Sequence, residues 1–250
     1  MLKIIADDYG LAPDIDRAIG TLSEQNKLHK TSVMANPTYT PPPLPKSIEI
    51  GLHIDLTTPR SLAHSGSRIS PKHLLLKPPP LNILIQHITA QLDLLQSRQF
   101  EIQYLDTHQH VHVVPRIFKA LIHIAQNRQI PKIRCLTMQP RHLLFYCKSL
   151  IQHGFAKQLK KMLPLYTVGR IMAHKLNRAN IAYSPNLILM PLAQGGNYKD
   201  LLATLINHFQ NCDAEFVTHP GLKTDLPDEP YLDGREIEYH ALADVHREDS

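Results

Sequence analysis

Residues 106–112 carry one carboxylate and three imidazoles at alternate positions, Asp106, His108, His110 and His112. We predict that this stretch continues a β-strand, in which alternate side chains point to the same face. Such a row of ionisable side chains does not suit a hydrophobic core. Imidazoles are typical ligands of a divalent metal ion, and a nearby carboxylate can orient a ligating ring. The stretch therefore predicts one wall of a metal site.

Three further polar clusters stand at the ends of predicted strands. Asp7 and Asp8 end the first strand, His53 closes the third, and His219 follows the last. Strands alternate with segments of helical periodicity, which favours a parallel sheet covered by helices, either open or closed into a barrel. Active sites of such folds gather at the C-terminal ends of the strands. We therefore expect all four clusters to converge on one rim.

The expected elements follow the hydrophobic periodicity and the prolines. The strands are expected at 2–6, 31–35, 48–54, from 104 into the histidine-rich stretch, 132–136, 187–190 and 215–218. Helices are expected from Pro13, from residue 81 and from Pro115, and then over 200–210 and 235–244. We expect residues 57–80 to form a loop. Residues 140–180 should form helical pieces interrupted at Gly154, Pro164 and Gly169.

Length alone suggests one or two domains, and single α/β barrels commonly have this size. The composition is that of an ordinary globular protein, with 43% hydrophobic and 20% charged residues, and we expect one domain spanning residues 1–250. The net charge is +5, but we interpret the densest basic group, Lys157, Lys160 and Lys161, as a solvated helix face rather than a nucleic-acid site. The N-terminus does not resemble a signal peptide, and no apolar run is long enough to span a membrane. Three widely spaced cysteines fit a reducing compartment. We therefore expect a cytoplasmic protein with no nucleic-acid partner, and we leave open whether it forms a homodimer.

An aspartate and two histidines from three strand ends would form a mixed oxygen and nitrogen site. Zn²⁺ accepts such ligands with one position open to water, and Mg²⁺, Mn²⁺ or Co²⁺ also fit. Hydrolysis then needs a base and an acid, for which one aspartate of the Asp7–Asp8 pair and His219 are the candidates. In a regular strand the two aspartates would point to opposite faces, whereas a turn at Gly10 would bring both to the rim. Alternatively, one of them caps the helix near Pro13.

Several motifs together resemble YdjC-like carbohydrate deacetylases, a family that includes chitooligosaccharide and hopanoid-associated deacetylases. The resemblance covers most of residues 1–136, then 213–221, and weakly 235–244. Its motifs, in chain order, are Ala6-Asp7-Asp8-Tyr9-Gly10, Thr31-Ser32-Val33-Met34-Ala35-Asn36, Gly51-Leu52-His53, Leu105-Asp106-Thr107-His108-Gln109-His110-Val111-His112 and His219-Pro220-Gly221.

The resemblance implies an irregular (β/α) barrel of the TIM type, related to polysaccharide deacetylases, with one divalent ion, Mg²⁺ or Zn²⁺. It implies that Asp8, His53 and His108 bind this ion. The spacing alone does not choose between His108 and His110 as the ligand, because both are expected on the same face.

The resemblance also implies that Asp7 is the general base and His219 the general acid. The remaining polar residues of these motifs would orient the ligands or contact the substrate; they are Asp106, His110 and His112. Arg134, in the next predicted strand, is a candidate to orient Asp7 or bind substrate, with a structural salt bridge as the alternative.

We therefore expect a metal-dependent carbohydrate N-deacetylase, a hydrolase of non-peptide carbon–nitrogen bonds acting on an N-acetylated sugar. Tyr9, Tyr39 and Tyr183 are the candidates to stack on the sugar. One alternative is another metal-dependent amidohydrolase, but there a His-x-His motif typically closes the first strand, where this chain has Asp-Asp. A second alternative is a non-catalytic metal- or sugar-binding protein, which would need neither Asp7 nor His219.

Overall fold

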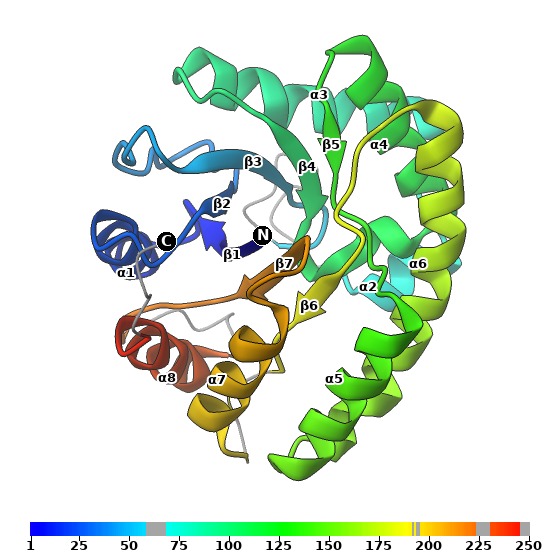
Figure 1. Ribbon diagram of the computed structural model, residues 1–250. Coiled ribbons are helices and arrows are strands. Elements are labelled where there is room, and N and C mark those ends of the chain that lie inside the picture. Colours follow the sequence, from blue (N-terminus) through cyan, green and yellow to red (C-terminus); the bar gives the residue numbers. More distant parts are fainter. Residues whose placement is uncertain (59–68, 192, 194–195, 224–230, 246–250) are drawn as a thin grey trace.

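The computed structural model describes residues 1–58, 69–191, 193, 196–223 and 231–245. Within these residues, seven parallel strands form one sheet in the order β5-β4-β3-β2-β1-β7-β6. The sheet curls into a half-barrel with the helices outside it (Figure 1), which confirms the predicted α/β barrel-like class. The strands are β1 Leu2–Tyr9, β2 Lys30–Val33, β3 Glu49–Ile54, β4 Tyr104–Thr107, β5 Lys132–Ile133, β6 Leu187–Leu189 and β7 Ala214–Thr218.

The helices follow the predicted apolar stripes. Helix α3, for example, buries one apolar stripe, which consists of Leu84, Ile88, Leu92 and Leu95. The helices are α1 Pro13–Glu24, α2 Pro71–Leu76, α3 Leu81–Ser97, α4 Pro115–Asn127, α5 Pro140–Gln152, α6 Leu159–Ala179, α7 Tyr198–Phe209 and α8 Leu232–Ala243, with 3₁₀ helices η1 His108–Val113 and η2 Ala156–Gln158. Among the described residues, none of these helices combines the length and apolar character needed to cross a bilayer.

The sheet edges β5 and β6 do not pair with each other as strands. Instead, the segment before β6 bridges the gap. The backbone N–H of Ile133 donates to Ala182 over 3.1 Å, and that of Leu187 donates to Thr137 over 2.8 Å. These bonds satisfy backbone groups that an open sheet would leave exposed, so the half-barrel holds its curvature without an eighth strand.

Charged side chains occupy the end of the half-barrel where the strands begin. Lys30, which is only 1% exposed, contacts Glu215 over 3.1 Å and also pairs with Glu49. Lys132 pairs with Glu215 from the other side. Each buried charge therefore has an opposite partner, which avoids the large penalty of an isolated buried ion. This arrangement fills one end of the barrel and leaves the carboxyl ends of the strands for a site.

Three of the predicted loop or break positions are wrong. Residues 71–76, expected in a loop, form helix α2, while residues 59–68 lie outside the described part. Helix α6 runs without interruption through Pro164 and Gly169. Pro164 is on the exposed side, where water can satisfy the carbonyl that proline leaves without an N–H partner. Gly169 permits close packing rather than ending the helix, because a Cβ there would lie 1.6 Å from the Leu136 carbonyl oxygen.

The histidine-rich stretch is also different from the prediction. Strand β4 ends at Thr107, and the chain then forms η1, in which Gln109 and His110 have left-handed φ values of 54° and 55°. The strand alternation that would have placed Asp106, His108, His110 and His112 on one face is therefore wrong beyond Thr107. Helix α4 begins at Pro115, as expected.

We predict that Gly169→Ala destabilises the protein by about 1–3 kcal/mol or more, because the new methyl group overlaps backbone that cannot move aside easily. Gly20→Ala, in the middle of α1, is the matched control, since a Cβ at Gly20 meets no atom within 4 Å. This control should leave stability unchanged or raise it by up to about 1 kcal/mol. Urea unfolding measures both, and equal midpoints for the two variants would contradict the packing of α6 described above.

Candidate active site

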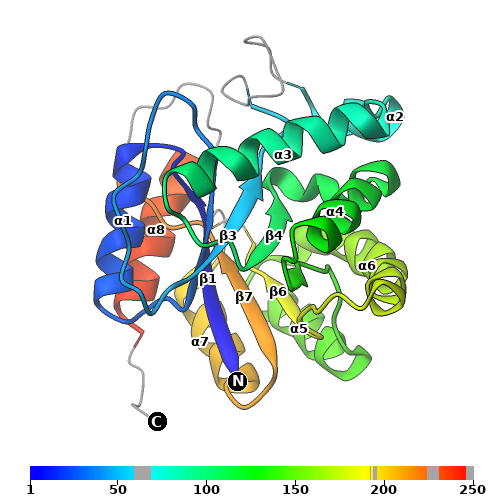
Figure 2. The same ribbon diagram turned by 90° about the horizontal axis from the view of Figure 1, so that it is seen from above.

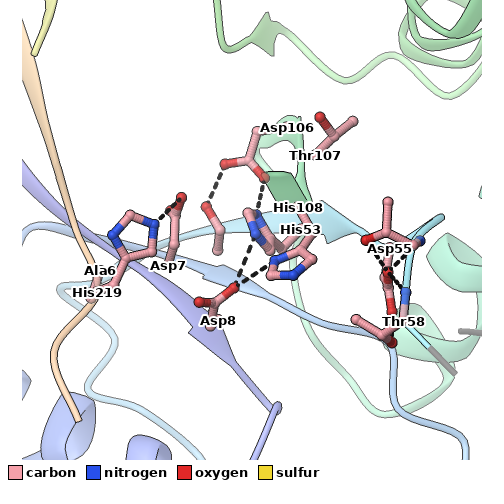
Figure 3. Close-up of polar contacts among 12 residues, drawn as sticks. Ala6, Asp7, Asp8, His53, Asp55, Thr58, Asp106, Thr107, His108 and His219 are labelled. Atoms are coloured by element: carbon pink, nitrogen blue, oxygen red, sulfur yellow. Dashed lines mark hydrogen bonds and ion pairs between the residues drawn. The ribbon is translucent and has the colours of Figure 1, made fainter. Parts of the chain in front are cut away.

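A bulge at the end of β1 brings two adjacent aspartates to the same rim. Ala6 pairs with Thr31 and Tyr9 with Val33, so β1 has one more residue than β2 between these pairs. The extra residue allows Asp8 to take a left-handed φ of 71°. Without the bulge, Asp7 and Asp8 would point to opposite faces of the sheet. With it, both carboxylates line one cleft. Figure 3 shows Asp7 beside His219, and Asp8 beside His53 and His108.

The turn after β1 holds this bulge in place. Gly10 has a φ of +90°, and a Cβ there would lie 2.8 Å from the Met34 carbonyl oxygen. The Gly10 N–H donates to buried Asp16 over 2.6 Å, and burial raises the pKa of Asp16 to about 6. The residue before α1 is Ala12, and no side chain caps the helix. Neither Asp7 nor Asp8 is therefore used as a helix cap.

Asp8, His53 and His108 come together from the ends of β1, β3 and β4. One carboxylate oxygen of Asp8, Oδ1, lies 3.2 Å from His53 Nε2 and 3.0 Å from His108 Nδ1. The other oxygen accepts from Arg235 over 2.6 Å. Burial would raise the pKa of Asp8, but Arg235 and His108 outweigh this and hold it well below its usual range. Asp8 is therefore an ionised carboxylate between two imidazoles.

Asp106 fixes the orientation of His53. The His53 Nδ1–H donates to Asp106 over 2.6 Å, which directs Nε2 toward Asp8. Asp106 is fully buried and also accepts from Ser32 and Arg134, each over 2.6 Å. Burial favours the neutral form of His53, but the carboxylates of Asp106 and Asp7 outweigh it and raise the pKa of His53 well above its usual range.

Asp7 lies in a different environment from its neighbour Asp8. Its two oxygens accept from the Arg134 guanidinium over 2.6 and 2.7 Å, and both side chains are 1% exposed. Burial would raise the pKa of Asp7, but the Arg134 guanidinium holds it well below its usual range. His219 also lies close to Asp7, with its Nε2 4.0 Å from Asp7 Oδ2. Burial lowers the pKa of His219 to about 4, so its ring is neutral at neutral pH.

The two later histidines of the stretch differ from each other. His110 lines the cleft, and its buried Nδ1 has no hydrogen-bond partner among the described residues. His112 points back into the protein, where Thr107 Oγ1 bonds its Nδ1 over 2.6 Å and accepts its backbone N–H over 3.0 Å. Burial lowers the pKa of His112 to about 3. His112 thus stabilises the turn after β4, while His108 and His110 reach the cleft.

The cleft has a volume of about 380 Å³ and both polar and apolar lining residues. The polar ones include the aspartates and histidines described above. The apolar ones are Pro71, Met162, Leu165, Leu189 and Met190. The prediction that Tyr9 stacks on the sugar is wrong, since this residue is 1% exposed and its hydroxyl donates to the Pro42 carbonyl. Tyr231, not Tyr39 or Tyr183, lines the described part of the cleft.

The sequence model of the family described as YdjC-like protein matches residues 1–248. The chain belongs to the YdjC-like family. This family is carbohydrate deacetylase-like. No curated protein matches the sequence.

Among solved structures, the chain is similar to a protein of Enterococcus faecalis V583 named "putative cellobiose-phosphate cleavage protein". The two share 16% identity and a TM-score of 0.65, over 96% of this chain and 89% of the other. The chain is also similar to a lactam utilization protein of Thermus thermophilus, with 13% identity and a TM-score of 0.47, over 97% of this chain and 96% of that one. At such identities, the first likeness supports the barrel-like fold of this YdjC-like chain.

Helix α8 supplies site residues that the sequence analysis missed. Arg235 binds Asp8, as described above. Glu238 is fully buried and accepts the His219 backbone N–H over 2.6 Å and the Tyr231 hydroxyl. Burial raises the pKa of Glu238 to about 7. The signal in the sequence was helical spacing, because Tyr231, Arg235 and Glu238 stand at i, i+4 and i+7 and so share one face of the helix.

The donor set of this YdjC-like chain fits a divalent metal ion. Ligating atoms of Asp8, His53 and His108 all lie within 4.8 Å of one another, and so do those of Asp7, His53 and Asp106. Ligands about 2.0–2.2 Å from one ion lie roughly 2.8–3.1 Å apart in octahedral geometry and roughly 3.3–3.6 Å apart in tetrahedral geometry. The 3.2 and 3.0 Å separations around Asp8 Oδ1 lie within the span of these spacings. In the second group, Asp106 already uses its oxygens on His53, Ser32 and Arg134. We therefore favour the first group as the ligands.

We predict that His53→Ala and His108→Ala each remove most of the bound metal. Each substitution leaves only two of the three proposed ligands, and two ligands cannot hold the ion in competition with water. His123→Ala, at an exposed position of α4, is the matched control and should keep the wild-type content. Elemental analysis of the purified proteins measures the metal content. Full occupancy in both cleft variants would exclude these histidines as ligands.

We predict that Asp106→Asn lowers metal affinity by about 10–100-fold without abolishing binding. A neutral amide orients the His53 ring less firmly than a carboxylate does, and it makes the ring a weaker metal ligand. Chelator competition measures the affinity, and excess metal should restore full occupancy. An affinity equal to wild type would show that the short bond between Asp106 and His53 does not act on the ion.

Proposed function

We propose that the protein is a metal-dependent hydrolase that removes the acetyl group from an N-acetylated sugar. The observation that supports this most strongly is the different environment of the two adjacent aspartates. Asp8 faces two imidazoles, as a metal ligand would. Asp7 is bound to Arg134 and faces His219 across the cleft. A protein that only stored or carried a metal ion would need the first arrangement but not the second.

Asp8, His53 and His108 would hold the ion. A divalent ion bound there would polarise the acetamide carbonyl and acidify a water molecule. The apolar residues of the cleft, such as Met162 and Leu165, suit the methyl part of an acetyl group. Gln109, Gln158 and Lys161 also line the cleft and are available to bond the hydroxyl groups of a carbohydrate.

Asp7 accepts the proton of the attacking water in this proposal. Its bidentate contact with Arg134 keeps the carboxylate ionised and fixes its direction. The same contact makes Asp7 a weak base that releases a proton readily, because its pKa lies well below the usual range. Asp7 can therefore pass the proton on during the reaction rather than retain it.

His219 is the group that receives this proton and gives it to the leaving amine. Its Nε2 lies 4.0 Å from Asp7, and its low pKa of about 4 makes its protonated form a strong acid. The water oxygen bonds to the carbonyl carbon and the carbon–nitrogen bond breaks. Acetate then leaves with that oxygen, and the sugar amine takes up the proton. Glu238 supports this step by holding the His219 backbone.

The direct test of the proposed function is acetate release from a panel of N-acetylated mono- and oligosaccharides. The purified protein is assayed as isolated, after chelation, and after addition of Zn²⁺, Mg²⁺, Mn²⁺ or Co²⁺. We expect release that stops on chelation and returns with metal. Release that persists in full after verified metal removal, or no release from any N-acetylated sugar, would contradict the proposal.

We predict that Asp7→Asn keeps metal occupancy but lowers turnover by about 10²–10⁴-fold, because the amide cannot accept a proton from water. Asp14→Asn changes a half-buried carboxylate in the first turn of α1, away from the cleft; it is the control and should retain wild-type turnover. Turnover is measured at saturating substrate and metal. A wild-type rate in Asp7→Asn would refute its role as base.

We predict that His219→Ala loses less activity on substrates with a weakly basic leaving amine, because such amines need less help from an acid. Comparing N-acetylated sugars with N-acetylated anilines measures this difference. An equal loss for every substrate would mean that His219 binds or positions the substrate and does not protonate the leaving group.

A further inference from the structure

The charges of this chain are strongly segregated along the sequence. Between Asp106 and Asp200 there are fourteen Lys and Arg residues and no acidic residue. The rest of the chain has 13 basic and 22 acidic residues. These basic residues look scattered along the sequence, but half of the fourteen lie on the exposed sides of α5 and α6. These residues are Arg141, Lys148, Lys160, Lys161, Arg170, Lys175 and Arg178.

Apolar side chains lie among these cations. Of the eight large apolar residues that are exposed in the described part, four are on α5 and α6: Leu144, Ile151, Leu163 and Ile171, which are 43–60% exposed. On α5, Leu144 and Ile151 share one face with Arg141 and Lys148, because the four stand at helical spacing. On α6, Leu163 and Ile171 are similarly interleaved with lysine and arginine.

The two helices form one continuous surface. Figures 1 and 2 show α5 and α6 side by side at the edge of the molecule. A groove of about 210 Å³ lies between them, lined by Pro140 and Leu143 of α5 and by Leu163, Thr167 and Arg170 of α6. Among the described residues, no carboxylate forms an ion pair with the basic residues of this surface. The start of α6 also lines the cleft, so the surface reaches the edge of the candidate site.

We propose that the exposed face of α5 and α6 docks on an anionic lipid surface. Interleaved cationic and apolar residues suit the boundary of a bilayer, where Leu and Ile enter the acyl region while Lys and Arg reach the head groups. Each basic residue near an anionic bilayer strengthens binding roughly fivefold. The face therefore binds peripherally, and no helix needs to span the bilayer.

Charge complementarity selects the lipid surface over other occupants. A twofold dimer through this face would bring like-charged patches together, which opposes association. Nucleic acid would meet the cations, but four exposed aliphatic side chains gain nothing from a phosphate backbone, and the exposed part of the face has no aromatic side chain on which bases could stack. Anionic lipid accounts for both the cations and the aliphatic residues.

Vesicle co-sedimentation tests this proposal with the full chain. Phosphatidylcholine vesicles that contain about one third phosphatidylglycerol are compared with pure phosphatidylcholine vesicles. We expect binding to the anionic vesicles, weaker binding at high salt, and little binding to the neutral ones. Absence of binding to anionic vesicles overturns the proposal, and so does equal binding to both vesicle types.

Two sets of exposed substitutions separate the charge contribution from the apolar contribution. Replacing Lys148, Arg170 and Lys175 by Gln should lower the partition coefficient on the order of 100-fold. Leu144→Ser with Ile171→Ser should lower it by at least roughly tenfold. The matched controls on other surfaces are the Lys46→Gln, Lys72→Gln and Lys119→Gln triple variant and the single variant Ile237→Ser, which should bind as wild type does.

Two outcomes reassign the surface and would overturn the lipid proposal. One is duplex DNA binding as tight as vesicle binding with no effect of the Leu144 and Ile171 substitutions. The other is a dimer in sedimentation velocity that the same substitutions dissociate. Thermal unfolding confirms that each variant is folded. Acetate release from a water-soluble substrate should not change in any of them, so the failure of this proposal is distinguishable from that of the proposed function.

Discussion

The bulge at the end of β1 is the constraint on which the candidate site depends. It places Asp7 and Asp8 on one rim, although a regular strand would separate them. A residue other than glycine with a positive φ costs about 1–2 kcal/mol, and aspartate is among the residues that tolerate this conformation best. The left-handed Asp8 is held by the turn at Gly10 and by its ion pair with Arg235. One extra residue thus turns two equivalent carboxylates into two groups with different partners.

Each of the two aspartates is balanced by its own arginine. Arg134 from the end of β5 binds Asp7, and Arg235 from α8 binds Asp8. Asp106 adds a third buried carboxylate that Arg134 also contacts. Three buried carboxylates face two guanidinium groups, and the His53 imidazolium, whose pKa is raised well above its usual range, supplies the third positive charge. A divalent ion beside Asp8 would replace the His53 proton and leave both imidazoles as neutral donors.

The convergence of the polar clusters was predictable because it follows from the topology of parallel strands. Asp8, His53 and His108 meet at one rim, since strands β1, β3 and β4 all end there. The family resemblance favours His108 over His110 as a ligand, and the structure places His108 next to Asp8. Most helices were predictable as well, because their apolar stripes are long and begin at prolines.

Other features depended on tertiary contacts that one sequence does not display. The left-handed residues Gln109 and His110 end β4 early, and nothing in the alternating histidines indicated this. Pro164 and Gly169 have the usual signature of helix ends, yet exposure of the first and close packing of the second keep α6 intact. Arg235 was missed because its partner, Asp8, lies more than two hundred positions away in the chain.

The position of the metal ion tests this account most directly. Crystals of the protein soaked with Co²⁺ or Zn²⁺ would show the ion by its anomalous scattering. We expect a single ion about 2.0–2.2 Å from Asp8, His53 and His108, with the Asp7 carboxylate still bound to Arg134 and not to the ion. An ion bound among Asp7, His53 and Asp106, or coordinated directly by Asp7, would contradict the division of roles between the two aspartates.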